Sequence, residues 1–168
     1  MKIVQIILSR GFAGSERYAA DLCKSLSARH EVVIVIQSDH RDDNGVSIRD
    51  WLAPTVKVIE IGKWFQGLRL ASILRRVRPD VIHAHLKYAS RLAPTVAMGT
   101  PTISTLHLEY KHKHFRKLDA VICITDGQRS TIPPEFAGRV FVIPNSYLPH
   151  RRLSEDERSK LRDQFGID

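Results

Sequence analysis

The chain has 168 residues, of which 43% are hydrophobic and 26% are charged. This length accommodates one sizeable core, the composition excludes a disordered chain, and the apolar start at residues 3–8 is too short for a signal peptide or a membrane span. The formal net charge of +8 is concentrated in residues 63–117, which hold eleven basic and two acidic side chains. We therefore expect a cytoplasmic protein whose basic stretch meets phosphate-bearing partners, with a patchless solvated surface as the alternative.

The first elements of the chain are a strand, a turn and a helix. Residues 3–8 are almost continuously apolar, which is typical of a strand buried on both faces of a parallel sheet. The turn ends at Gly14, and Ser15 is a candidate N-cap of the helix. A glycine turn after such a strand presents backbone N–H groups and the positive end of a helix dipole to an anion. The alternative is a tight turn that needs glycine for its backbone angles alone.

A second buried strand, at residues 31–37, completes a β-α-β unit. The predicted fold class is therefore α/β, a doubly wound parallel sheet of the Rossmann-like type. In the helix expected at residues 90–98, Pro94 is tolerated only if it lies near the first turn. The later elements are expected as strands at 56–61, 80–85, 101–106, 119–124 and 139–143, and helices at 68–77, 90–98 and 154–166.

Histidines occupy two of the predicted strand ends. His85 ends one strand and His107 directly follows the next, so both are expected at the carboxyl edge of the sheet, where open parallel sheets bind ligands. His83 is expected to be structural, with its side chain on the other face of the sheet. Cys23 lies on the apolar face of the predicted first helix and Cys123 in a strand-like run, so both are expected to be buried thiols, and no metal site is predicted.

Four stretches, in this order, resemble the amino-terminal half of a group 1 (family 4) glycosyltransferase of the two-domain GT-B type. This resemblance implies retaining transfer of a sugar from a nucleotide-diphosphate donor to a hydroxyl acceptor, expected to be a lipid-linked or envelope glycan. It implies no cofactor beyond the donor substrate. The four stretches are Ala13-Gly14-Ser15-Glu16, Asp80-Val81-Ile82-His83-Ala84-His85, Ser104-Thr105-Leu106-His107 and Val142-Ile143-Pro144-Asn145.

The resemblance also assigns roles to single residues. Gly14 matches the glycine whose backbone approaches the donor phosphates and the acceptor. His107 matches the catalytic histidine that meets the donor sugar, where it would orient a hydroxyl rather than act as a nucleophile. Glu16 and His85 match recurrent donor- or acceptor-binding positions, and Asn145 matches the hinge between the two domains.

The chain departs from the family pattern at two positions and in its extent. Ala13 and Ser146 stand where the family usually has glycines. We expect residues 1–148 to form the acceptor-side domain, and residues 149–168 to be a linker and helix leading to an absent donor-binding domain. The chain alone is then expected to be inactive, because no nucleophile–base pair or paired carboxylates appear in it.

Other functions remain open at this point. A free-standing domain that binds a phosphate, a nucleotide or an anionic surface without chemistry is the main alternative, and a related sugar epimerase or phosphorylase is another. Nucleic-acid binding is not expected, because no basic strand interleaved with aromatic residues is present.

The basic stretch predicts a peripheral membrane surface on the inner face, or a surface for an acidic partner. Trp64, Phe65 and Leu68 are candidates for insertion into lipid, although packing against the neighbouring strand is favoured. The cations expected on this surface are Arg69, Arg75, Arg76, Lys111 and Lys113.

Overall fold

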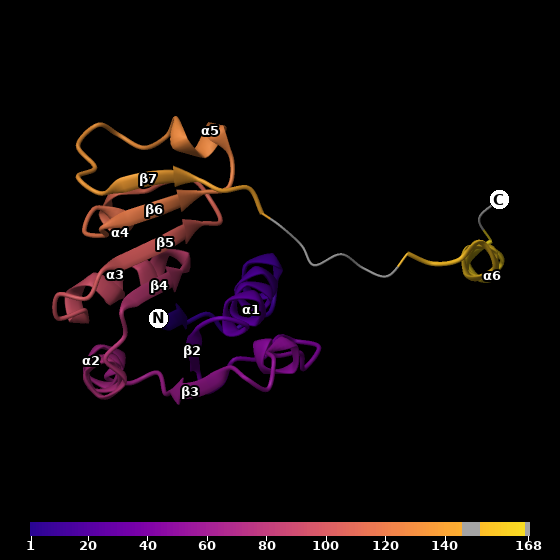
Figure 1. Cartoon of the computed structure of the whole chain (residues 1–168), viewed down its shortest axis with the longest axis horizontal. Coiled ribbons are helices and arrows are strands. Elements are labelled where there is room, and N and C mark those ends of the chain that lie inside the picture. The colour runs from indigo at the N-terminus through magenta and orange to yellow at the C-terminus, as the bar shows by residue number, and fades with distance from the viewer. Residues whose placement is uncertain (146–151, 167–168) are drawn as a thin grey trace.

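The computed structural model describes residues 1–145 and 152–166. The strands of these residues form one seven-stranded sheet in the order β3-β2-β1-β4-β5-β6-β7, and every neighbouring pair is parallel (Figure 1). The predicted doubly wound α/β fold is confirmed. The strands are β1 (Lys2–Ile7), β2 (Glu31–Gln37), β3 (Lys57–Ile61), β4 (Val81–His85), β5 (Thr102–Leu106), β6 (Ala120–Cys123) and β7 (Arg139–Val142).

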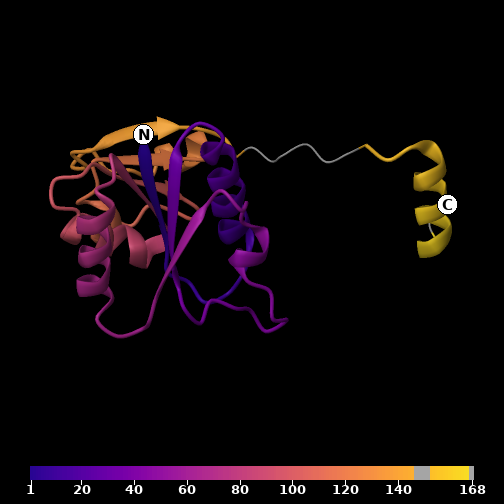
Figure 2. The same cartoon turned by 60° about the horizontal axis from the view of Figure 1, so that its bottom comes forward.

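Helices cover both faces of the sheet, and Figure 2 shows the sheet between α1 and α2. One face packs against α1 (Gly14–Ser27) and the short helix η1 (Ile48–Trp51), and the other packs against α2 (Gln66–Val77) and α3 (Leu86–Val96). Two single-turn helices follow, α4 (His112–Phe115) and α5 (Asp126–Arg129).

The core has a separate apolar cluster on each side of the central strands. Val4 and Ile6 of β1 join the α2 and α3 side, whereas Ile7 joins the α1 side. Because side chains alternate along a strand, β1 and β2 must be apolar at nearly every position, which is why they were recognisable in the sequence. Cys23 and Cys123 are free and buried, as predicted, and burial raises the pKa of Cys23 to about 12.

The third helix differs from its prediction. It begins at Leu86, directly after β4, so Pro94 lies inside its last turns rather than near its first turn. Proline has no backbone N–H, so Pro94 costs α3 one intrahelical hydrogen bond. Because Pro94 is near the end of the helix, only the final turns are affected. Ser15 is likewise not an N-cap, because α1 begins at Gly14 after Ala13.

The prediction that Trp64, Phe65 and Leu68 pack against a strand is wrong. Their side chains are 79%, 73% and 73% exposed at the start of α2. Phe65 also has a φ of 56°, in the left-handed region that is unfavourable for a bulky residue. The apolar side of α2 is instead supplied by Leu70, Ile73 and Leu74.

The last described helix, α6 (Glu155–Phe165), confirms its predicted caps. Ser154 and Glu157 form a capping box, and Gly166 adopts the left-handed conformation at the end. Of the predicted linker at 149–153, residues 149–151 lie outside the described residues, as does Ser146.

Candidate functional site

Two histidines meet at the carboxyl edge of the sheet. His85 is the last residue of β4 and His107 directly follows β5, and these strands are neighbours. Nδ1 of His85 lies 3.2 Å from Nε2 of His107, and Nε2 of His85 lies 2.8 Å from Oε1 of Gln5 on β1. Tyr18 of α1 covers the pair, with its ring edge-on to His107 at 5.3 Å. The fold therefore brings together residues from β1, from β4, from the loop after β5 and from α1.

His83 belongs to the same cluster, contrary to its prediction. Its ring lies 4.5 Å from that of His85, and its Nε2 lies 2.9 Å from Oγ1 of Thr105. The two histidines are two residues apart in one strand, and a period of two puts both side chains on the same face of the sheet. This face is the one that α1 covers, because His85 contacts Tyr18.

Burial keeps these imidazoles neutral near pH 7. Burial, with a smaller contribution from His107, lowers the pKa of His83 to about 3. Burial and then the two neighbouring histidines hold the pKa of His85 well below its usual range. Burial lowers the pKa of His107 as well, and the carboxylate of Glu16 partly opposes that shift. A neutral imidazole offers one donor and one acceptor, so this cluster suits hydrogen bonding rather than charge pairing.

Glu16 braces the turn that precedes α1. It is 3% exposed, and its carboxylate accepts hydrogen bonds from the hydroxyls of Ser9 and Ser15 and from the backbone N–H of Ala13. Three donors therefore hold one carboxylate at the start of the helix, where negative charge is favourable. These hydrogen bonds fix the turn, and the carboxylate is close enough to His107 to act on it electrostatically, while a donor- or acceptor-binding role of Glu16 stays a prediction.

Gly14 is the exposed first residue of α1. A Cβ atom placed on it would meet no atom of the chain within 4 Å, and its φ is not in the left-handed region. The tight-turn explanation for this glycine, which needs special backbone angles, therefore fails. The space beside Gly14 stays open, as a closely approaching ligand would require.

A small cavity of about 260 Å³ opens at the same edge of the sheet. It is lined mostly by apolar groups, and His85 forms part of its wall. Leu86 has a φ of 65°, a conformation that is costly for a leucine and that turns the chain sharply from β4 into α3. The apolar residues that line the cavity include Leu8, Leu86, Tyr88, Ala89 and Leu108.

Residues 12–147 match the sequence profile of Glycosyltransferase Family 4. The chain belongs to this family. The match spans most of the chain and includes the glycine turn, both strand-end histidines and Asn145.

Several solved structures share the fold of this family 4 chain. HepE of Anabaena, crystallised with UDP and glucose, is 19% identical with a TM-score of 0.69, and the match covers 99% of this chain and 50% of HepE. A glycosyltransferase of Rickettsia africae is 15% identical with a TM-score of 0.70, over 99% of this chain and 50% of that protein.

An epimerase is similar as well. UDP-GlcNAc 2-epimerase of Neisseria meningitidis, bound to UDP-GlcNAc, is 16% identical with a TM-score of 0.64, over 86% of this chain and 47% of the epimerase. The family 4 chain thus spans about half the length of each of these three proteins, and it has the fold of one half of a GT-B glycosyltransferase. Among curated proteins, no sequence matches it significantly.

The other predicted site residues of the family 4 chain lie apart from the histidines. Asn145 is exposed beyond the end of β7. Arg69, Arg75 and Arg76 are exposed on α2, and Lys111 and Lys113 are exposed at α4. No helix in the described ranges is long and apolar enough to cross a membrane, and no three His, Cys, Asp or Glu side chains in those ranges are arranged so that they could hold a metal ion.

A second cavity, of about 170 Å³, lies between α3 and α4. No carboxylate lines it, and within residues 1–145 and 152–166 none of its lysines or arginines forms a salt bridge. Burial and the charges of Lys113 and Arg91 lower the pKa of His114 there. The lining consists of Arg91, Thr95, Lys113, His114, Arg116 and Lys117.

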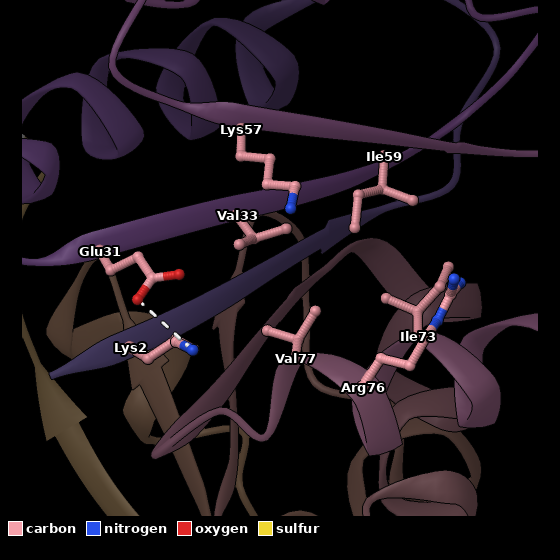
Figure 3. A pocket seen from close by; sticks show the side chains of 8 residues that line it. All are labelled: Lys2, Glu31, Val33, Lys57, Ile59, Ile73, Arg76 and Val77. Atoms are coloured by element: carbon pink, nitrogen blue, oxygen red, sulfur yellow. Dashed lines mark ion pairs between the residues drawn. The ribbon is translucent and has the colours of Figure 1, made fainter.

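Figure 3 shows a third cavity, of about 390 Å³. Its wall includes Lys2, Glu31 and Lys57, which are the first residues of β1, β2 and β3, so it opens at the amino edge of the sheet. The ion pair between Lys2 and Glu31, at 3.4 Å, spans part of its rim. This cavity is at the opposite end of the strands from the histidines and does not belong to their site.

The sequence interpretation missed Gln5 and Tyr18, and it misplaced His83. The sequence did contain a signal for Gln5. In β1, whose other buried residues are apolar on both faces, Gln5 is the single polar side chain in the middle of the strand. Tyr18 gave no signal, because an aromatic residue on a helix is ordinarily part of the core.

Proposed function

We propose that this chain is the acceptor-side half of a retaining glycosyltransferase, which moves a sugar from a nucleotide-diphosphate donor to a hydroxyl acceptor. The observation that carries the proposal is the position of the His107 imidazole. It is kept neutral at the carboxyl edge of the sheet, beside the start of α1, in a chain of family 4. Related structures hold UDP and glucose, or UDP-GlcNAc, which supports a nucleotide-sugar donor.

The proposed role of His107 is to orient the donor sugar by a hydrogen bond to one hydroxyl. Such a bond acts by positioning and charge stabilisation, without a covalent intermediate on the histidine. The nearby carboxylate of Glu16 already accepts three hydrogen bonds and is therefore poorly suited to attack a sugar. The backbone at Gly14 provides the close approach for the donor phosphates and the acceptor, and Asn145 would lie at the hinge to the donor-binding domain.

The acceptor is proposed to carry an apolar portion, as a lipid-linked glycan does. The support is the cavity of about 260 Å³ beside His85, whose lining is mostly apolar. Tyr88 and Leu108 leave 43% and 60% of their side chains exposed at this cavity, which provides an apolar surface next to the histidines.

We extend the proposal to peripheral attachment at the inner face of a membrane. Exposed arginines on α2 and lysines at α4 would contribute about 1 kcal/mol each near an anionic surface. Trp64, Phe65 and Leu68 add a strongly exposed apolar group at the start of α2. Phe65 keeps an unfavourable backbone conformation while exposing its ring, which fits a residue that serves an external contact.

The second candidate function is a domain that binds a phosphate or an anionic surface without chemistry. The cavity of about 170 Å³ between α3 and α4 favours it, because its lysines and arginines have no carboxylate partner in the described ranges. This cavity lies on the helix layer opposite α1, away from the histidines, so the two candidate functions use different surfaces.

Transfer assays on two proteins test the proposal. The 168-residue chain, and the same chain joined to a donor-binding domain of family 4, are incubated with nucleotide sugars and glycolipid acceptors, and the anomeric configuration of the product is determined. We expect no turnover from the chain alone and retention of configuration from the joined protein. Turnover by the chain alone, or inversion of configuration, would contradict the proposal.

A further inference from the structure

The hydrogen bonds between Gln5, His85 and His107 fix where each proton lies. The amide oxygen of Gln5 only accepts, so Nε2 of His85, at 2.8 Å, must be the donor. A neutral imidazole has one protonated nitrogen, and Nδ1 of His85 is therefore an acceptor. Nε2 of His107, at 3.2 Å, must then donate to it. Nδ1 of His107 is left with a free lone pair, and it makes no hydrogen bond within the residues that the structure describes.

The surroundings favour this single arrangement. Gln5 and His85 are both fully buried, so water does not compete for their hydrogen bonds. The rings of His83 and Tyr18 lie against His85, with centroids 4.5 Å and 6.1 Å from its own, and they restrict its rotation. Gln5 and His85 therefore set the proton position on His107, the partly exposed third member of the series.

Gln5 gains little for the fold by being polar. It lies in the middle of β1 between Val4 and Ile6, where an apolar side chain would suit the core. Its Nε2 is buried and has no hydrogen-bond partner in the described part of the chain. A buried amide with unmet donors is destabilising, and such groups are often tied to a site.

We propose that Gln5 is a positioning residue that sets the tautomer of His107 through His85, so that Nδ1 of His107 accepts a hydrogen bond from a hydroxyl of the bound substrate. This inference rests on the proposed function. It also gives the site a preference, because a lone pair accepts from a sugar hydroxyl but repels the acceptor-only oxygen of a phosphate or carboxylate. Sugar hydroxyls are then read here, and the donor phosphates are held elsewhere.

The tautomers can be measured directly on the 168-residue chain. Two-bond proton–nitrogen NMR correlations of its histidine rings show which nitrogen carries the proton. We expect His85 and His107 to be protonated at Nε2 in the unmodified chain at neutral pH. A proton on Nδ1 of His107 would overturn the proposal, and this result needs no variant and no substrate.

Gln5→Leu tests the direction of control. It removes the acceptor for His85, and we expect His107 to become a mixture of tautomers. Gln5→Glu keeps an acceptor at the same place and should restore the Nε2 form. The matched control is Gln37→Leu, because Gln37 is a buried glutamine at the end of β2 whose side chain donates to Asp39, and only its backbone carbonyl accepts from a histidine, the N–H of His40. A Gln5→Leu chain in which His107 stays wholly in the Nε2 form would refute the role of Gln5.

Kinetics of the chain joined to a family 4 donor-binding domain separate this inference from the proposed function. Gln5→Leu should lower kcat roughly tenfold, with Gln5→Glu nearer the unmodified rate, because one hydrogen bond to the sugar loses its preset geometry. If transfer occurs and the variants alter the tautomer without altering kcat, the positioning role fails while the proposed function stands. If no transfer occurs although the NMR results are as expected, the proposed function fails and the tautomer control stands.

Discussion

Nε2 of His107 lies 3.2 Å from Nδ1 of His85, and the two residues are at the ends of the neighbouring strands β5 and β4. Parallel strands end at the same edge of a sheet, so two residues 22 positions apart in the chain become direct neighbours there. This contact connects a half-buried histidine, which is accessible to a ligand, to a histidine that is fully enclosed.

His107→Ala should lower sugar transfer by roughly ten- to thousandfold in the chain joined to a family 4 donor-binding domain, because one positioned polar group is lost. Thermal stability should change little, since His107 lies beyond the strand end. Initial rates at saturating donor measure the effect. His112→Ala is the control, because it removes an exposed histidine from α4. Unchanged rates for His107→Ala would assign this histidine a structural role only.

Gly14→Ala should weaken nucleotide-sugar binding by about tenfold without destabilising the fold. The added methyl group meets no atom of the chain, so any loss must come from the space that a ligand occupies. Calorimetric titration with the donor, alongside a thermal melt, checks both parts. Gly67→Ala is a suitable control. Gly67 lies in α2, and a Cβ added to it would make only an ordinary van der Waals contact with Leu92 of α3. Equal binding by both variants and the unmodified protein would show that no ligand approaches Gly14.

Glu16→Ala should lower the free energy of unfolding by about 1 to 3 kcal/mol, because the N–H of Ala13 and two serine hydroxyls lose their acceptor. Urea denaturation of the 168-residue chain measures it. Glu135→Ala removes an exposed carboxylate and serves as the comparison. A loss no greater than that of Glu135→Ala would mean that water replaces Glu16 at the turn.

Stability should fall as the pH is lowered below about 6.5, and His83 should contribute to this slope together with His85, whose pKa is lowered in the same direction. The pKa of His83 is about 3 in the folded chain, so between these values the unfolded state binds the extra proton. At a pH near 4.5 this difference destabilises the fold by about 2 to 3 kcal/mol. His83→Gln should remove that part of the pH dependence in urea titrations at several pH values. A slope that persists unchanged in this variant would show that other groups cause it.

Phe65→Asn should have opposite effects on stability and on membrane binding. Asparagine tolerates the left-handed conformation, so the fold should gain about 1 kcal/mol, while loss of the exposed ring weakens attachment to anionic vesicles. Thermal melts and vesicle co-sedimentation measure the two effects. Phe141→Asn is the comparison, since Phe141 is 44% exposed on β7 and lies in register with Ile122 rather than on α2. Binding that is equal for anionic and neutral vesicles, or absent at low salt, would remove the membrane role.

Local sequence determined the fold class of this chain. Runs such as residues 31–37 are apolar at nearly every position, and only a strand covered on both faces requires that pattern. Ser154 and Glu157 likewise specified the start of α6, because a capping box depends on residues three apart. The order of strand ends also placed His85 and His107 at one edge, since parallel strands share their direction.

Only the tertiary structure decided what surrounds those histidines. Gln5 is 80 residues from His85 in the chain, and the pair meets because β1 lies beside β4 in the sheet, an order that no local pattern encodes. The same holds for Tyr18, which reaches the site from α1, and for Trp64, whose exposure depends on where α2 docks. Periodicity specifies which side of an element is apolar, whereas the burial of a given side chain depends on its neighbours from distant parts of the chain.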